Sequence, residues 1–127
     1  MVGPRVLLME DQEVLLSLLE ELLTDEGIAV TVSRSLAETY AAAASGAIAV
    51  AVVDSWGASH ETLDPGERQQ IEHLARLVPT VLVSGRAWAR HATAQELGVA
   101  ALLCVPFDLD VLSRIVKRLL PAGEREQ

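Results

Sequence analysis

The stretch AIAVAVVD, residues 47 to 54, is an unbroken run of small apolar residues that ends in an acid. A strand that is apolar on both faces is buried on both sides, which is typical of parallel sheets covered by helices. Other apolar runs that fit strands occupy residues 5–9, 28–33, 80–83 and 101–105. The run at 47–54 therefore predicts an inner strand of a parallel sheet.

Segments of helical periodicity separate these runs. Several have residues suited to their ends: Ser35 and Asp108 as N-caps, and Gly27, Gly46, Pro79 and Gly98 as stops. The segment 86–97 is the more polar exception. We expect a weak helix there, with residues 89–97 mobile because few apolar contacts would hold them.

Five strand–helix units in strict alternation imply a parallel sheet with helices on both faces. Right-handed crossovers leave few topologies, and the strand order 2-1-3-4-5 is common for five such strands. We therefore predict a doubly wound, flavodoxin-like α/β fold. The chain has 127 residues, and we expect one domain at 1–121 followed by a charged tail at 122–127.

Composition argues against several classes of partner. The formal net charge of −8 makes direct binding to nucleic acid unfavourable. No apolar run approaches the roughly 20 residues that cross a bilayer, so we expect no membrane partner. Cys104 is the single cysteine, so no intrachain disulfide can form. This fits a reducing compartment, and we expect a cytoplasmic protein.

Acids follow two strands that the predicted order makes neighbours. Glu10 and Asp11 come directly after the first strand, and Asp54 comes after the third. Ligands of open α/β sheets bind at this switch point, so the three side chains should converge there. Like charges 4 Å apart repel by about 4 kcal/mol at an effective dielectric of 20, which raised pKa values or a divalent cation would offset. Mg²⁺ suits carboxylate oxygens, and Asp54 could then act as a nucleophile toward a phosphoryl group.

The loop after the first strand does not suit a nucleotide. Nucleotide-binding relatives of this architecture carry glycines there. Residues 9–14 read MEDQEV, with no glycine and with a charge of the wrong sign for a phosphate cradle. Ser84, at the end of the fourth strand, adds a hydroxyl at the same edge of the sheet.

Taken together, these residues resemble a response-regulator receiver domain over about residues 4–120. The resemblance is carried by Glu10–Asp11, Asp54, Ser84 after PTVLV, and the Pro106–Phe107 pair after the fifth strand. It implies two-component signalling, in which a sensor histidine kinase passes a phosphoryl group to Asp54 and an unknown downstream protein reads the result.

The resemblance also implies roles for individual residues. Glu10, Asp11 and Asp54 would hold Mg²⁺, with the backbone carbonyl of Trp56 completing the site. Ser84 would move to contact the phosphoryl group. Such a domain is a phosphoryl acceptor and is not expected to be an enzyme.

The chain departs from the family pattern at the end of the fifth strand. The lysine that normally precedes the proline is replaced by Val105, and the usual aromatic residue three positions earlier is Leu102. Lys117 lies about three helical turns further on and cannot stand in. Arg86, two residues after Ser84, is a candidate to reach the phosphoryl group instead. The sequence therefore predicts a degenerate receiver.

Four points stay open. A pseudo-receiver, a protein-interaction module that is never phosphorylated, is favoured by Val105 and opposed by the intact acids. A small phosphatase that uses Asp54 would need a general acid close by, and Ser55 is a poor one. The wide apolar face of the first helix fits either a homodimer surface or deep burial. The chain is either a stand-alone regulator or a piece of a longer protein.

Overall fold

The computed structural model describes residues 5–57 and 59–121. Its core is a five-stranded parallel sheet with the order β2-β1-β3-β4-β5, so the predicted topology is confirmed. The strands are β1 (Arg5–Met9), β2 (Ala29–Ser33), β3 (Ile48–Asp54), β4 (Thr80–Ser84) and β5 (Ala101–Cys104). The predicted tail at 122–127 lies outside the described residues.

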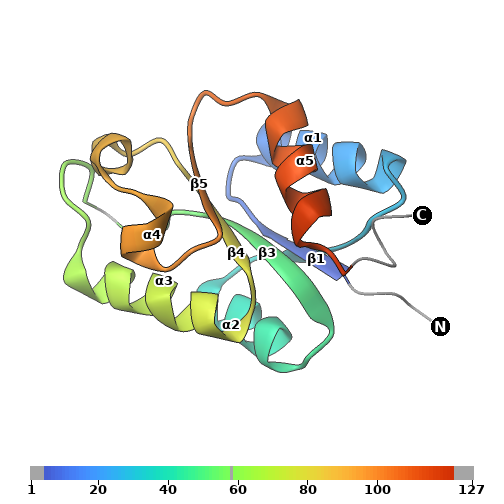
Figure 1. The fold of residues 1–127 in the computed structure, drawn as a ribbon, viewed down its shortest axis with the longest axis horizontal. Coiled ribbons are helices and arrows are strands. Elements are labelled where there is room, and N and C mark those ends of the chain that lie inside the picture. Colours follow the sequence, from blue (N-terminus) through green and yellow to red (C-terminus); the bar gives the residue numbers. More distant parts are fainter. Residues whose placement is uncertain (1–4, 58, 122–127) are drawn as a thin grey trace.

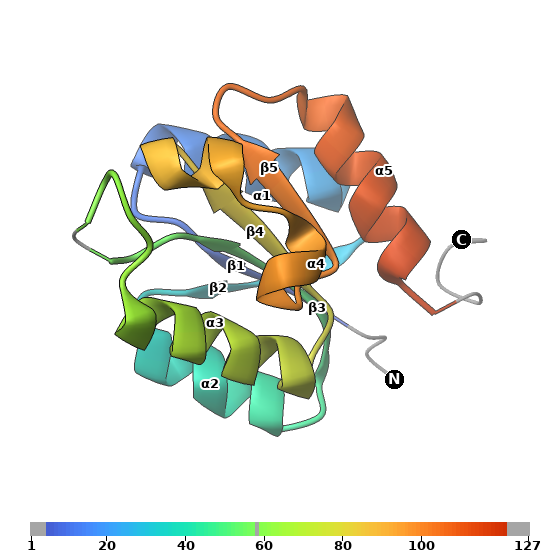
Figure 2. The same cartoon turned by 60° about the vertical axis from the view of Figure 1, so that its left-hand side comes forward.

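Helices cover both faces of the sheet (Figures 1 and 2). Helices α1 and α5 lie on one face, and α2, α3 and α4 lie on the other. Their bounds are α1 (Glu13–Asp25), α2 (Leu36–Ala44), α3 (Pro65–Leu77), the 3₁₀ helix η1 (Ala87–His91), α4 (Ala94–Leu97) and α5 (Leu109–Leu119). Among the described helices, none has both the length and the apolar character to span a membrane.

The sheet separates two hydrophobic cores, and alternate residues of each inner strand enter opposite ones. In β3, Val50 and Val52 pack toward α1 and α5, whereas Ala51 and Val53 pack toward α2 and α3. All four are buried. Full burial of a valine side chain is worth about 1.5–3 kcal/mol, so the apolar run that predicted the sheet also stabilises its centre.

The helix ends follow the signals in the sequence. The side chain of Ser35 accepts a hydrogen bond from Glu38 N, and that of Asp108 accepts one from Asp110 N. Asp64 caps α3, and Pro65 occupies its first turn, where a missing N–H costs nothing. Gly98 ends α4 at φ 75°, a left-handed conformation that favours glycine.

The prediction of one polar helix over 86–97 is wrong. Instead, η1 ends before Ala92, whose backbone is extended, and α4 begins after Thr93. The physical reason is a capping box: Thr93 Oγ1 accepts from Glu96 N, while Glu96 Oε1 accepts from Thr93 N.

The expectation that few apolar contacts hold this segment is also wrong. Trp88, Ala89 and Leu97 are 5%, 2% and 1% exposed and belong to the core beneath α3 and α4. The segment is therefore anchored at both ends by buried side chains, although its intervening residues are polar.

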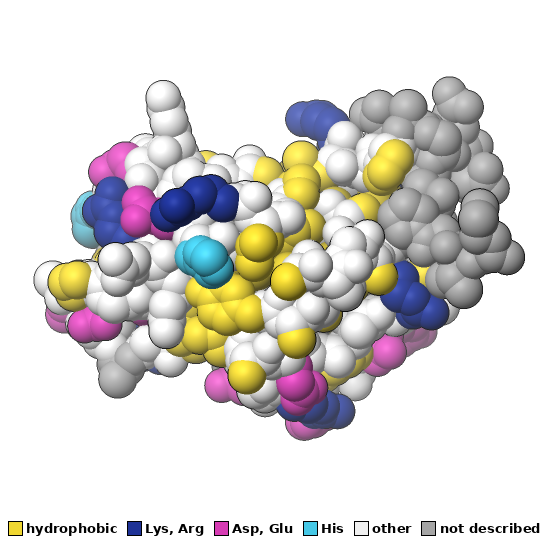
Figure 3. Space-filling model, turned by 90° about the horizontal axis from the view of Figure 1, so that it is seen from below, with side chains coloured by type: hydrophobic (Ala, Val, Ile, Leu, Met, Phe, Trp, Pro, Cys, Tyr) yellow, Lys and Arg dark blue, Asp and Glu magenta, His cyan; other side chains and the backbone are white. Residues whose placement is uncertain are grey.

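Apolar side chains also reach the surface in places. Val14 and Leu18 of α1 are 76% and 46% exposed, which leaves the possible homodimer surface of that helix a prediction. Seen from the side of α2 and α3, apolar side chains gather in the middle of the surface, and charges of both signs lie around them (Figure 3). Leu77 of α3 is 41% exposed, and scattered exposed apolar residues of this kind are normal in soluble proteins.

Candidate functional site

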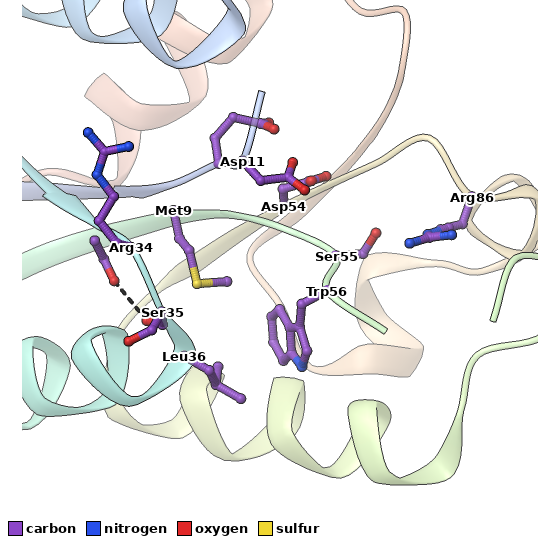
Figure 4. A pocket seen from close by; sticks show the side chains of 11 residues that line it. Met9, Asp11, Arg34, Ser35, Leu36, Asp54, Ser55, Trp56 and Arg86 are labelled. Carbon is purple, nitrogen blue, oxygen red and sulfur yellow. Dashed lines mark hydrogen bonds between the residues drawn. The ribbon is translucent and has the colours of Figure 1, made fainter. Parts of the chain in front are cut away.

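Three acids meet where β1 and β3 end. The register pairs Met9 with Val53, so the residues that follow leave the sheet side by side. Carboxylate oxygens of Glu10, Asp11 and Asp54 all lie within 4.8 Å of one another. Asp11 and Asp54 gather at one rim of the pocket drawn in Figure 4. The predicted convergence of the three acids is confirmed.

Glu10 is held at the inner side of this cluster. It is 9% exposed, and its Oε2 accepts a hydrogen bond of 3.1 Å from Gln12 N. Burial raises the pKa of Glu10, and the neighbouring Asp11 raises it further, while the bond from Gln12 N opposes both. Its position is therefore fixed by the turn that starts α1.

Asp54 carries the largest electrostatic penalty of the cluster. Burial raises its pKa to about 7, and the negative charges of Glu10 and Asp11 add to this effect. The positive charge of Arg86 acts in the opposite direction. In the absence of a cation, the carboxyl group of Asp54 is thus partly protonated near neutral pH.

The donor set fits a hard divalent cation. It consists of carboxylate oxygens, and Mg²⁺ takes one or two carboxylates while keeping several waters. An open pocket of about 390 Å³ adjoins the acids and leaves room for such waters. A cation would also remove the repulsion that raises the pKa of Asp54.

Trp56 lies two residues beyond Asp54 and lines the same pocket. Its backbone N–H donates to Glu67 Oε2 at 2.9 Å, and its indole Nε1 donates to Gln70 Oε1 at 2.8 Å. Both partners belong to α3, so this helix holds the segment that follows the acceptor position. The role of the Trp56 carbonyl as a metal ligand stays a prediction.

Ser84 lies at the same end of the sheet but is engaged elsewhere. It is fully buried, and its Oγ is 2.8 Å from Ser55 Oγ. The same oxygen accepts a hydrogen bond from Arg86 N at 3.1 Å. Either hydroxyl can be the donor of the bond between Ser55 and Ser84, so Ser84 can donate to a phosphoryl group only while it does not donate to Ser55.

No protein-family model matches the sequence, and no curated protein matches it. Solved structures match nearly the whole chain. The response regulator receiver protein from Sinorhizobium medicae WSM419 is 29% identical, with 94% of this chain and 96% of that one covered and a TM-score of 0.69. The non-phosphorylated HemR receiver domain from Leptospira biflexa is 24% identical, with 92% and 94% covered and a TM-score of 0.69. A response regulator from Thermotoga maritima is 16% identical, with 93% and 98% covered and a TM-score of 0.72.

The chain has the fold of a response-regulator receiver domain. In this receiver fold the end of β5 carries no positive charge close to the acids. Val105 is 40% exposed and lines a second pocket together with Asp54 and Arg86. An apolar side chain therefore faces the space beside the acceptor position.

Two arginines line the larger pocket of the receiver fold, and their surroundings differ. Arg34 Nη1 forms an ion pair of 3.0 Å with Glu13 Oε1. Arg86 lines both pockets and forms no ion pair within the part of the chain that the structure describes. Its side chain extends toward Ser55 in Figure 4. Arg86 is therefore the better placed of the two to meet an anion beside Asp54.

Glu67 is the site-related residue that the sequence reasoning missed. It lies three positions after the N-cap Asp64, where an acid normally satisfies the helix terminus. The structure instead buries it to 3% exposure beneath the loop that follows β3. The local sequence gave no signal for this contact, because its partners are the backbone N–H groups of Trp56 and Gly57.

Proposed function

We propose that this chain is a phospho-accepting receiver domain of a two-component response regulator. Asp54 takes the phosphoryl group from a sensor histidine kinase, and Mg²⁺ is held by Glu10, Asp11, Asp54 and the backbone carbonyl of Trp56. One observation carries the proposal: the carboxylate oxygens of the three acids lie within 4.8 Å at the carboxyl edge of a receiver-type sheet.

In the proposed transfer, a carboxylate oxygen of Asp54 attacks the phosphorus of the kinase phosphohistidine. The P–N bond breaks, its electron pair returns to the imidazole, and an acyl phosphate forms on Asp54. The attack requires the ionised carboxylate, so the pKa of about 7 limits the reactive fraction while no cation is bound. Bound Mg²⁺ would supply the charge that neutralises the transferred phosphoryl oxygens.

Two further residues have roles in this proposal. The hydroxyl of Ser84 donates a hydrogen bond to a phosphoryl oxygen and not to Ser55. Arg86 supplies a positive charge that Val105 does not. The location of Arg86 in both pockets beside Asp54 supports this assignment. The face formed by α4, β5 and α5 then relays the state to an unknown downstream protein.

A pseudo-receiver is the second candidate. The observations that favour it are the apolar Val105 beside Asp54 and the mutual hydrogen bond of Ser55 and Ser84, which already satisfies the hydroxyl. In this alternative the acids stay unphosphorylated, and the domain acts only through protein contacts.

Phosphorylation of the intact chain separates the two candidates. The protein is incubated with acetyl phosphate and MgCl₂, and intact mass is measured. We expect the wild-type mass to increase by one phosphoryl group. No increase should occur when EDTA replaces MgCl₂, or in Asp54→Asn. A wild-type mass that stays unchanged, together with no thermal stabilisation by millimolar Mg²⁺, would favour the pseudo-receiver. Phosphotransfer from the host's purified histidine kinases then identifies the donor.

A further inference from the structure

Glu67 is a buried acid with an incomplete set of partners. Its Oε2 accepts hydrogen bonds of 2.9 Å from both Trp56 N and Gly57 N. Its Oε1 is buried with no hydrogen-bond partner among the described residues. Acids are rarely buried to this extent, because loss of solvation is costly. The contact with the loop after β3 therefore calls for a reason beyond the capping of α3.

One of these two hydrogen bonds fixes the direction of a carbonyl group. The N–H of Gly57 and the C=O of Trp56 belong to the same peptide unit, which is planar and trans. In a trans peptide these two groups point to opposite sides. Because the N–H points at Glu67 on α3, the Trp56 carbonyl points away from α3. In Figure 4, Asp11 and Asp54 lie on the side of Trp56 away from α3.

The packing around Gly57 shows independently that the carboxylate is tightly enclosed. A Cβ atom on Gly57 would lie 2.7 Å from Glu67 Cδ and closer still to Oε1, and real Cβ atoms essentially never show contacts under 3.0 Å. The absence of a side chain at position 57 thus allows the close approach of Glu67. The glycine and the buried acid form one unit.

We propose that Glu67 is a positioning residue for the metal site, which directs the Trp56 carbonyl toward the cation held by Glu10, Asp11 and Asp54. This inference rests on the proposed function, since it assigns a part of that same site. Gln70 provides the matched control. It also joins α3 to Trp56, but through the indole Nε1, so its loss leaves the peptide unit in place.

The experiment measures Mg²⁺ binding to the full chain by calorimetry, and thermal stability in EDTA, for E67A, E67Q and Q70A. We expect E67A to weaken Mg²⁺ binding by about tenfold, the lower range for loss of an outer-shell partner. E67Q should recover most of the affinity, because its amide oxygen can accept both N–H groups. Q70A should bind Mg²⁺ as the wild type does. If E67A does not fold, G57A displaces the same carboxylate and serves in its place.

The controls separate failure of this inference from failure of the proposed function. If D11N abolishes Mg²⁺ binding while folded E67A binds as tightly as the wild type, Glu67 has no positioning role and the metal site stands. If E67Q is as weak as E67A, the hydrogen-bond argument is overturned. If the wild type binds no Mg²⁺, both proposals are overturned together.

Discussion

The carboxyl group of Asp54 holds its proton much more tightly than an ordinary aspartic acid. Its pKa rises from 3.8 to about 7, first through burial and then through the charges of Glu10 and Asp11. Between these two values, the folded state binds more protons than the unfolded state. The free energy of unfolding of the metal-free protein therefore decreases as the pH rises across this range.

We predict that, in EDTA, the wild-type protein loses stability between about pH 4 and about pH 7, by about 4 kcal/mol at most. Asp54→Asn removes the titrating group, so its stability should depend much less on pH. The variant should exceed the wild type in stability above neutral pH. Urea denaturation at several pH values measures both effects.

Ser45→Ala, at the end of α2, is a control that should keep the wild-type pH dependence, since the hydrogen bonds of the Ser45 hydroxyl are with the backbone of Ala42 and Ala47. Equal pH profiles for the wild type and Asp54→Asn would contradict the electrostatic account. The prediction concerns the metal-free protein only. A bound divalent cation would remove much of the repulsion and shift the profile.

In the segment between β4 and β5, a short sequence motif determines where the helix α4 begins. Thr93 and Glu96 form the capping box that starts α4, and Trp88 anchors the preceding 3₁₀ turn in the core. We predict that Thr93→Ala lowers the free energy of unfolding by about 1 kcal/mol, the usual cost of losing an N-cap side chain. Chemical denaturation of the two proteins gives the difference.

A matched control for that substitution is Thr62→Ala, at an exposed loop position outside any helix. Its stability should stay within about 0.5 kcal/mol of the wild type, as expected for a surface change. An equal loss in both variants would show that the capping box contributes nothing. The segment's boundaries would then need another explanation.

The helices and strands show which features a single sequence can predict. The apolar run at 47–54 and the alternation of periodic segments sufficed for the sheet order, because burial on both faces leaves few arrangements. The break at Ala92 could have been predicted from the Thr93–Glu96 pair, a local signal masked by the polar composition around it. Burial of Trp88 and Glu67 depends on contacts distant in sequence, so no local pattern indicates it.

The candidate site was predictable in part for the same reason. Strand order alone brings Glu10, Asp11 and Asp54 together, since all three follow strand ends at one edge. The hydrogen bond between Ser84 and Ser55 depends on the rotamers of both side chains, which no pattern in the sequence indicates. The convergence of the three acids at this edge of the sheet was therefore predicted, while the hydrogen bonds of the side chains around them were not.

Across the whole molecule, the site is assembled from the loops that follow all five strands of the sheet. The chain as a whole has a formal net charge of −8, and the acids add to a negative field at this edge. Arg86, after β4, places a positive charge in the pocket that it shares with Asp54, whereas Val105, after β5, lines the same pocket without a charge. The positive charge available in this pocket affects how well the edge accepts an anion.

We predict that a positive charge at position 105 can replace the one lost from position 86, although the two positions are distant in sequence. Arg86→Ala should slow phosphorylation of Asp54 by acetyl phosphate in MgCl₂ by about tenfold, because removal of a charge that faces a transferred group raises the barrier. Val105→Lys places an ammonium group in the pocket that Asp54 shares, so the Arg86→Ala, Val105→Lys protein should regain most of the lost rate. Rates of mass gain by intact mass spectrometry, with thermal stability measured in parallel, provide the test.

The rescue depends on charge rather than on size. Val105→Met, which has a similar length without the charge, should therefore leave the Arg86→Ala rate low. If methionine restores the rate as well as lysine does, the pocket needs filling and the missing lysine has no electrostatic consequence. If neither restores it while all variants stay folded, the Arg86 side chain acts through a contact that a side chain at position 105 cannot replace.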